Sequence, residues 1–513
     1  FTYTFVRHIL CNRRCCRCYL FSKQRPFHFN NHCHDCGQIQ RFMPKQSRER
    51  DFLVNIMIYG IGNIGAKFIA FLMVPLYTYY VSPEDFGVYD VYLGLIFLIM
   101  PILTFDFRDG SFRLLLEEEH TEYWKTVITY TYRIIGKNIL VATIIYICLL
   151  FFYPFKYALE AYGMLLVFSI YEVHTQILRG INKNRYYVFA GILSTFLTGV
   201  LSVLFVVWGK LGVEGIFISN IISRILVLGW IEWQVPIFRK FIIKGLKKRE
   251  VRHALLHYSL PLLPNVVCWW VLSTADRLII MHYLGSEANG IYAVANKLSL
   301  ILGTFSTIIY QAWQDTAIRQ YQTPDRDVFF SRIFNLYTFY LGVLLVTCAI
   351  GLKIVLPWIV DASYQDSFYY IYPCFLTVFF FALSSFLDLG YQCSKQTKKM
   401  MPSILLATVI NLSLNLIFIQ YLGLQGVIIA SIISYAFLFV YRIFDTRQFF
   451  RIVWKFPSFI ALSLLFVTSI IYYYVDEWIW LILFQIGVLG ISWKYLPDKI
   501  KQKVYSIIDH GKK

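Results

Sequence analysis

Long apolar runs separated by short polar segments dominate the chain from residue 53 onward. Many of these runs reach about 20 residues, the length that an α-helix needs to cross the hydrocarbon layer of a bilayer. A spanning helix also satisfies its backbone hydrogen bonds internally, as lipid requires. The pattern therefore predicts an all-α polytopic membrane protein with about 14 transmembrane helices. The expected spans are residues 53–80, 86–105, 134–152, 158–178, 186–208, 213–236, 258–284, 290–313, 333–358, 367–390, 401–421, 424–443, 456–475 and 478–493.

Two short segments recur along the chain. Residues 81–89 match residues 284–292 in glutamate, glycine and tyrosine at one offset of 203. Residues 211–223 match residues 422–434 at an offset of 211. An internal repeat of this length indicates two similar halves. Because each half has an even number of spans, the repeats are expected to be parallel, related by an axis along the membrane normal.

After the first 42 residues, which are considered below, these matches divide the chain into four segments. We expect an N-lobe of six helices at 43–237, a basic cytoplasmic linker at 238–254, and a C-lobe of six helices at 255–445. Residues 446–513 would hold two further helices and a basic cytoplasmic tail. Residues 106–125 are expected to form a mixed-charge loop between the second and third spans.

Composition agrees with a membrane protein: 58% of the 513 residues are hydrophobic and 15% are charged. The net charge of +18 does not indicate nucleic-acid binding, because the basic residues form no long soluble patch. They gather instead in alternate loops, for example Lys395, Lys398 and Lys399, and then Arg442, Arg447, Arg451 and Lys455. The positive-inside rule then places these loops and both termini in the cytoplasm.

Residues 1–42 differ from the rest, with six of the eleven cysteines. Cys33 and Cys36 with His32 and His34 are a weak zinc motif, because no second Cys-x-x-Cys pair follows. We expect this segment to be a non-native or disordered leader, and Met43 to begin the protein.

Several charged residues interrupt the apolar spans, where charge is costly and usually functional. Lys67 and Arg224 fall near the middle of N-lobe spans, and Arg277 and Lys297 lie about seven residues from the 284–292 turn. At about 1.5 Å per residue both would lie roughly 10 Å below the surface and meet across the hairpin. Asp276 is expected to neutralise one of these two cations. Asp276 and Glu172 are candidates for gating by ion pairing or for binding a coupling proton or sodium ion; no other cofactor is indicated.

Residues 59–68, 75–77, 82–89, 276–277 and 290–297, in this order, resemble the polysaccharide-repeat-unit (lipid-linked oligosaccharide, Wzx-type) flippases. These belong to the multidrug/oligosaccharidyl-lipid/polysaccharide exporter superfamily, and the resemblance covers residue 43 to the C-terminus. It implies a two-lobed transporter of the bacterial inner membrane that moves undecaprenyl-pyrophosphate-linked oligosaccharide to the outer leaflet. It also implies that Lys67, Arg113, Arg277 and Lys297 are basic substrate-binding positions, to which placement in a span adds Arg224.

Two other functions remain open. A multidrug or cation antiporter of the same superfamily would suit the 19% aromatic content, but four intramembrane cations suit an anionic substrate better. A membrane polysaccharide polymerase or ligase would need a catalytic face outside, and the predicted outer loops are only about five to ten residues long. We therefore predict a transporter rather than an enzyme. Membrane lipids, a polysaccharide polymerase and glycosyltransferases are the expected partners, besides the lipid-linked oligosaccharide.

Overall fold

The computed structural model describes residues 69–495, apart from 70, 118–120, 153–155, 182, 243–248 and 395. Every regular element in these residues is helical, and ten helices or runs of helices are long and apolar enough to cross a bilayer. The predicted all-α polytopic fold is confirmed. The count of fourteen stays a prediction, since most of the expected first span and all of residues 1–42 lie outside the described residues.

The helices of the N-lobe segment and the linker come first. They are α2 (Pro83–Thr104), α3 (Phe107–Glu117), α4 (Thr121–Phe152), α5 (Ala158–Gly180), α6 (Asn184–Ser202) with the π-helical η3 (Val203–Trp208), α7 (Gly212–Gln234), α8 (Ile237–Phe241) and α9 (Arg249–Ser259).

The rest of the chain follows as α10 (Leu263–Thr274), α11 (Asp276–Gln320), α12 (Arg326–Ile359), α13 (Phe368–Cys393), α14 (Met401–Asp445), α15 (Phe456–Tyr474) and α16 (Trp478–Tyr495). Short 3₁₀ turns lie between them: η4 (Leu260–Leu262), η5 (Ala362–Ser367), η6 (Thr397–Met400) and η7 (Thr446–Gln448).

Two of these helices each contain a break that separates a pair of predicted spans. The breaks are at Gly285 in α11 and at Gly423 in α14. Gly423 has φ +58°, and Gly212, at the matching position of the 211-residue offset, has φ +54°. Glycine adopts this left-handed conformation without the steric cost that a Cβ brings. The two segments that match in sequence thus also turn in the same way, although the repeat of whole lobes stays a prediction.

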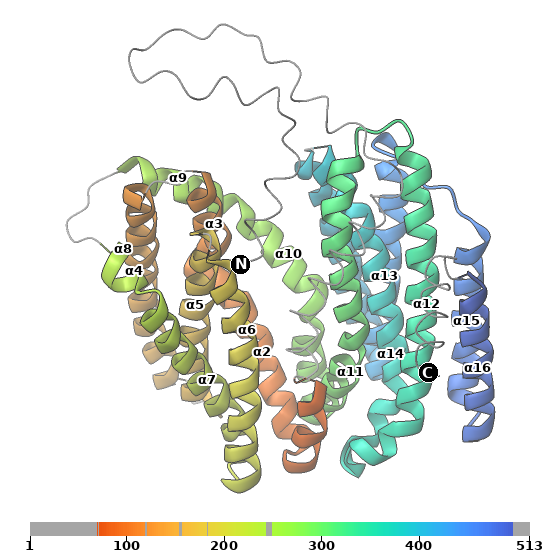
Figure 1. The fold of residues 1–513 in the computed structure, drawn as a ribbon. Coiled ribbons are helices and arrows are strands. Elements are labelled where there is room, and N and C mark those ends of the chain that lie inside the picture. The colour runs from red at the N-terminus through yellow and green to blue at the C-terminus, as the bar shows by residue number, and fades with distance from the viewer. Residues whose placement is uncertain are drawn as a thin grey trace, which may run out of the picture. The chain divides into compact units, whose positions relative to one another are not determined.

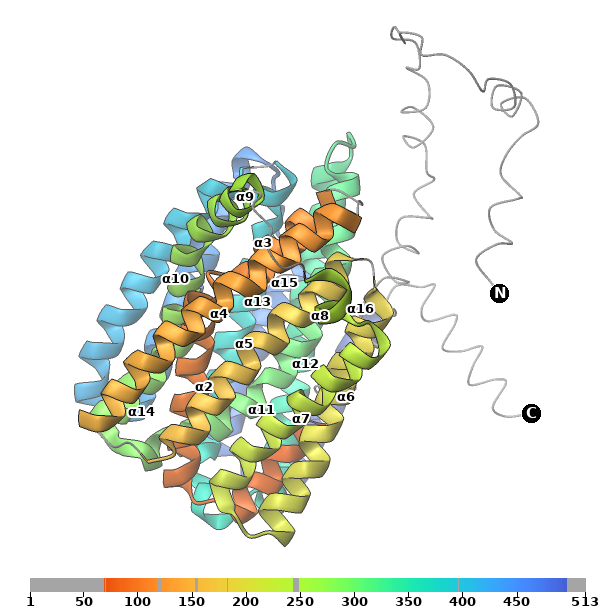
Figure 2. The same ribbon diagram turned by 90° about the vertical axis from the view of Figure 1, so that its left-hand side faces the viewer.

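Within residues 51–513, which form one compact unit, α2 and α11 pack side by side and connect the two lobe segments. α11 also packs on α13, α3 packs on α5, and α15 and α16 pack on the outer side of α12 (Figure 1). α4 lies on the near side of the bundle in Figure 2. Its apolar residues Leu140, Ile144, Ile147 and Phe151 are more than half exposed, as expected of a surface that faces lipid.

Two sequence expectations about these elements are wrong. The expected loop at 106–125 contains the helix α3, because Phe107, Leu114 and Leu115 bury one side of the segment in the core. Arg442, expected in a cytoplasmic loop, is instead fully buried within α14, which continues to Asp445. In both places, packing against neighbouring helices makes a segment helical although it is polar by composition.

Candidate functional site

The two repeated turns pack directly against each other. Ser82 caps α2 by accepting a hydrogen bond from the Asp85 backbone nitrogen, and Pro83 occupies the first turn, where its missing N–H costs nothing. A Cβ atom on Gly87 would lie 1.9 Å from the Ser286 carbonyl oxygen, and one on Gly290 would lie 1.9 Å from the Pro83 carbonyl oxygen.

These two contacts are reciprocal, since Pro83 and Gly87 match Ser286 and Gly290 at the offset of 203. Such reciprocity is what a two-fold axis produces. The Asn289 side-chain amide adds a 2.8 Å hydrogen bond to the Gly87 carbonyl oxygen. We call residues 82–90 and 284–292 the hairpin contact. Its backbones touch so closely that no side chain fits between them.

At the end of the hairpin contact, three charged groups meet between α2 of the N-lobe segment and α11 of the C-lobe segment. Arg277 Nε donates to Asp90 Oδ2 at 2.5 Å, and Lys297 Nζ lies 3.5 Å from Asp90 Oδ1. The Asp90 side chain is 3% exposed, whereas those of Arg277 and Lys297 are 15% and 22% exposed. We call these residues the interlobe triad. Because one carboxylate serves two cations, the triad carries a net charge of +1.

Aromatic rings surround the cations of the triad. Lys297 Nζ lies 3.9 Å from the ring centre of Phe86 and 5.4 Å from that of Tyr89. The Arg277 guanidinium lies 5.9 Å from the ring centre of Tyr292. Ring faces stabilise cations that have lost part of their hydration, so the site is built to hold positive charge inside the protein.

Arg224 of α7 is connected by hydrogen bonds, through Asn220, to Tyr89 next to Asp90 of the triad. Its Nη1 donates to Asn220 Oδ1 at 2.9 Å, and Asn220 Nδ2 donates to the Tyr89 hydroxyl at 3.4 Å. The guanidinium also lies 3.7 Å from the ring centre of Phe168. Among the described residues, Arg224 has no carboxylate at ion-pair distance. It therefore adds a positive charge within the N-lobe segment, where it interacts electrostatically with Glu172.

The expected role of Asp276 as the neutralising partner is wrong, because Asp90 of α2 has that role. Asp276 instead accepts hydrogen bonds from the Tyr292 hydroxyl at 3.1 Å, from Asn415 Nδ2 at 2.9 Å and from Ser431 Oγ at 3.0 Å. It lines a cavity of about 260 Å³ within the C-lobe segment. The signal for Asp90 was present in the sequence: it is a lone carboxylate in an apolar span, next to the repeated tyrosine.

The other predicted site residues are dispersed. Lys67 lies outside the described residues. Arg113 occupies an exposed position on α3. Glu172 on α5 lies 3.4 Å from Arg108, at the opposite end of α2 from the hairpin contact. The structure thus brings Arg277 and Lys297 together at Asp90, connects Arg224 to Tyr89 through Asn220 and electrostatically to Glu172, and places Arg113 on an exposed face of α3.

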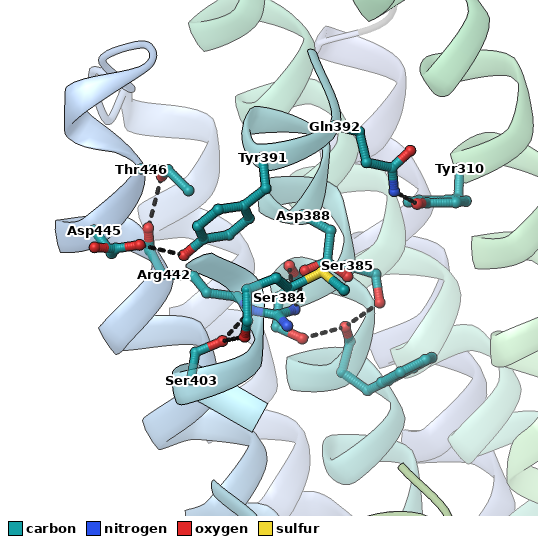
Figure 3. A network of polar contacts seen from close by, with 12 residues as sticks. Tyr310, Ser384, Ser385, Asp388, Tyr391, Gln392, Ser403, Arg442, Asp445 and Thr446 are labelled. Atoms are coloured by element: carbon teal, nitrogen blue, oxygen red, sulfur yellow. Dashed lines mark hydrogen bonds and ion pairs between the residues drawn. The ribbon is translucent and has the colours of Figure 1, made fainter. Parts of the chain in front are cut away.

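A second buried ion pair, which sequence analysis missed, joins α13 to α14 (Figure 3). Arg442 contacts Asp388 directly and donates to the Ser384 carbonyl oxygen at 3.2 Å. Its Nε donates to Ser403 Oγ at 3.3 Å. These partners come from within the C-lobe segment. A buried cation with this many partners typically stabilises the packing of the helices that it joins. Removal of one partner would lower the stability of the fold.

A metal centre requires a cluster of acidic, histidine or thiol groups. Among the residues that the structure describes, no three His, Cys, Asp or Glu side chains lie close enough to hold a metal ion together. The weak Cys–His motif of residues 32–36 falls outside the described part of the chain.

The described part of the chain is thus a bundle of helices long and apolar enough to cross a membrane, with charged side chains of α2 and α11 paired in its interior. The chain is similar to an inward-facing multidrug resistance MATE family transporter of the MOP superfamily, with 14% identity and a TM-score of 0.63 over 74% of this chain and 94% of the other. The outward-facing conformation of such a transporter matches with 15% identity and a TM-score of 0.55, over 82% and 98%.

A MOP superfamily transporter from Pyrococcus furiosus, described as having a binding pocket of reverse polarity, matches with 13% identity and a TM-score of 0.53, over 82% and 99%. At these identities the likeness shows the fold. The family model for polysaccharide biosynthesis proteins matches residues 52–314, just over half of the chain, and the chain belongs to this family. Among curated protein sequences, none matches it.

Proposed function

We propose that this protein is a flippase for polysaccharide precursors. It would move undecaprenyl-pyrophosphate-linked oligosaccharide repeat units from the inner to the outer leaflet of the bacterial inner membrane. Membership of the polysaccharide biosynthesis family and the transporter fold support this proposal. A lipid pyrophosphate cannot cross hydrocarbon unaided, because desolvating its charges costs many kcal/mol.

The interlobe triad is the observation that carries the proposal. Arg277 and Lys297 share one carboxylate and retain a net charge of +1, so an anion that displaces Asp90 gains two cations at once. Arginine presents a planar fork to two oxygens of one phosphate, and lysine adds a point charge for the next phosphate. Arg224 would add attraction from the N-lobe side.

Displacement of Asp90 would also produce the conformational change. Asp90 belongs to α2, whereas Arg277 and Lys297 belong to α11, so their ion pairs tie the two lobes together behind the hairpin contact. A pyrophosphate that binds Arg277 and Lys297 in place of Asp90 breaks these ion pairs between α2 and α11. The hairpin contact then separates, and the substrate gains access to the other side of the membrane.

The coupling ion is proposed to bind at Asp276. Three oxygen-bearing side chains, Tyr292, Asn415 and Ser431, donate hydrogen bonds to this carboxylate, and Asn411 accepts one from Asn415 beside them. Asn415 Oδ1 is buried without a hydrogen-bond partner, an arrangement that a cation with oxygen ligands would satisfy. Either a sodium ion or a proton on the carboxylate fits this chemistry.

Lys297→Gln and Arg277→Gln should each abolish surface polysaccharide in a complementation assay, while the protein still accumulates in the membrane. Arg277→Lys should retain part of the activity. Lys156→Gln is a matched control, because Lys156 also pairs with an α2 aspartate, at 2.6 Å, but is largely exposed. Normal polysaccharide export in the Arg277→Gln, Lys297→Gln double variant would refute the proposal.

A drug or cation antiporter is the second candidate, favoured by the aromatic and acidic lining of the C-lobe cavity. Trp269, Phe381 and Tyr435 line it together with Asp276, which suits an organic cation. Drug-resistance measurements beside the complementation assay distinguish the two functions. Resistance that depends on Asp276, with polysaccharide export unaffected, would favour the antiporter.

The proposed topology has both termini in the cytoplasm and the hairpin contact facing outward. Cysteine labelling from outside tests it in a background without native cysteines. A cysteine at Glu287 should be labelled and one at Lys398 should not. Both positions are exposed in the structure, so burial would not confuse the result.

A further inference from the structure

The junction between α2 and α3 carries an acidic side chain into a cavity. α2 ends at Thr104, and Phe105 and Asp106 both have left-handed backbone angles, with φ of 52° and 51°. This double turn directs Asp106 into a cavity of about 190 Å³ lined from α2, α3, α5 and α10. α10 follows the linker whereas the other helices precede it, so the cavity lies between the two lobe segments.

Asp106 is a buried carboxylate at this junction. Its side chain lines the cavity, the residue is 5% exposed, and Oδ2 is buried with no hydrogen-bond partner in the part of the chain that the structure describes. An ionised carboxylate in such a position bears most of its desolvation cost, whereas a protonated one does not. The site therefore favours a bound proton on geometric grounds alone.

The charged groups around Asp106 lead to the same conclusion. Arg108 on α3 is already shared, since its Nη1 lies 3.4 Å from Glu172 Oε2 and its Nε lies 3.5 Å from Asp109 Oδ1. One cation thus serves two carboxylates before Asp106 is counted. If Asp106 ionises, three carboxylates face one guanidinium in this cavity.

Among the described residues, α7 carries one further cation, Arg224, whose charge acts on Glu172, and the sides of α10, α9 and α4 that face this junction bring none. α10 contributes Val266 to the lining, and α9 turns the buried residues Leu255 and Ser259 toward α3, while its His253 and His257 are exposed. α4 contributes the neutral Asn138, whose amide donates to the Leu103 carbonyl oxygen at 2.8 Å.

The pKa of the Asp106 carboxyl lies near neutral pH. Burial, with a smaller contribution from Asp109, raises the pKa of the Asp106 carboxyl to about 7, and Arg108 opposes this shift. Below this pH the carboxyl is neutral; above it the carboxylate is charged. Small changes near neutral pH would therefore switch its charge.

We propose that Asp106 is a proton-binding site at the base of α2 that couples protonation to the opening of the lobes. α2 is a continuous helix between this site and the interlobe triad. Asp90 lies 14 residues before the end of α2 at Thr104, or about 21 Å along the helix axis, and Asp106 follows two residues later. Loss of the proton adds a repelling charge beside Glu172 and Asp109, which pushes the base of α2 away from α3 and α5. The resulting tilt of α2 reaches Asp90, so protonation favours the closed hairpin contact seen here.

The transport consequence rests on the proposed flippase function, whereas the proton site can be tested without any substrate. Full-length protein in nanodiscs is titrated between about pH 5 and about pH 9, and infrared difference spectra report the band of protonated carboxyl groups. The wild-type spectra should include the loss of a carboxyl component with a midpoint near pH 7, and Asp106→Asn should lack that component. Asp361→Asn, a partly exposed aspartate that caps η5, is the matched control and should titrate as the wild type does.

A second measurement covers the case in which Asp106→Asn fails to fold. Asp106→Glu keeps the carboxyl and should retain a band with a shifted midpoint. A wild-type spectrum without any carboxyl change near neutral pH, or the same change in Asp106→Asn, would overturn the proton site. If the band depends on Asp106 but lipid-linked oligosaccharide is not transported, the flippase proposal fails while the proton site stands.

Discussion

Replacement of Asp90 by asparagine tests the interlobe triad directly. The substitution keeps the shape of the side chain but removes the single negative charge that faces Arg277 and Lys297, so the local net charge rises from +1 to +2. At an effective dielectric constant of about 20, two unit charges about 3.5 Å apart attract by roughly 5 kcal/mol. Breaking a buried pair typically costs about 3–5 kcal/mol.

A loss of this size would change the conformational equilibrium by several orders of magnitude, because about 1.4 kcal/mol corresponds to a factor of ten. We expect Asp90→Asn to lose the closed hairpin contact while part of the protein remains folded. Ala293→Cys provides the reporter, since Ala293 is fully buried on α11 beside Tyr292. Its labelling from outside should be slow with Asp90 present and fast in Asp90→Asn.

A double variant supplies the control for charge. Asp90→Asn with Lys297→Gln returns the local net charge to +1, so the labelling rate and the amount of folded protein should recover in part. The amount of protein is measured by fluorescence-detected size exclusion on the same membranes. The reasoning is refuted if Asp90→Asn labels Ala293→Cys no faster than the parent does and accumulates to the same level.

Three further predictions follow from other contacts. Gly87→Val should prevent closure of the hairpin contact and stop polysaccharide export, because its Cβ would overlap the Ser286 carbonyl; Gly136→Val, on an open helix face, should leave export intact. Arg442→Met should lower the folded yield several-fold by leaving Asp388 unpaired, and adding Asp388→Leu should restore much of it. Asp276→Asn should keep the folded yield but remove the dependence of transport on a sodium or proton gradient, measured in proteoliposomes.

Sequence pattern alone established the class of fold. Apolar runs of spanning length require helices in lipid whatever their neighbours are, so an all-α membrane protein follows from local information. The breaks at Gly285 and Gly423 were equally visible as polar turns between two runs. Arg277 and Lys297 stood out because a charge within an apolar run is evident without any contact.

Only the tertiary structure decided which groups are partners. Asp276 is the chain neighbour of Arg277, yet it faces Asn415 and Ser431 within the C-lobe segment, while Asp90, 187 residues away, reaches Arg277. Neighbouring residues on a helix point about 100° apart, so adjacency in sequence separates side chains that packing alone can bring together. The burial of Asp106 was likewise not predictable from the sequence. Its place after a span predicts a solvated loop, and it is the packing of α3 and α5 around it that buries the carboxyl.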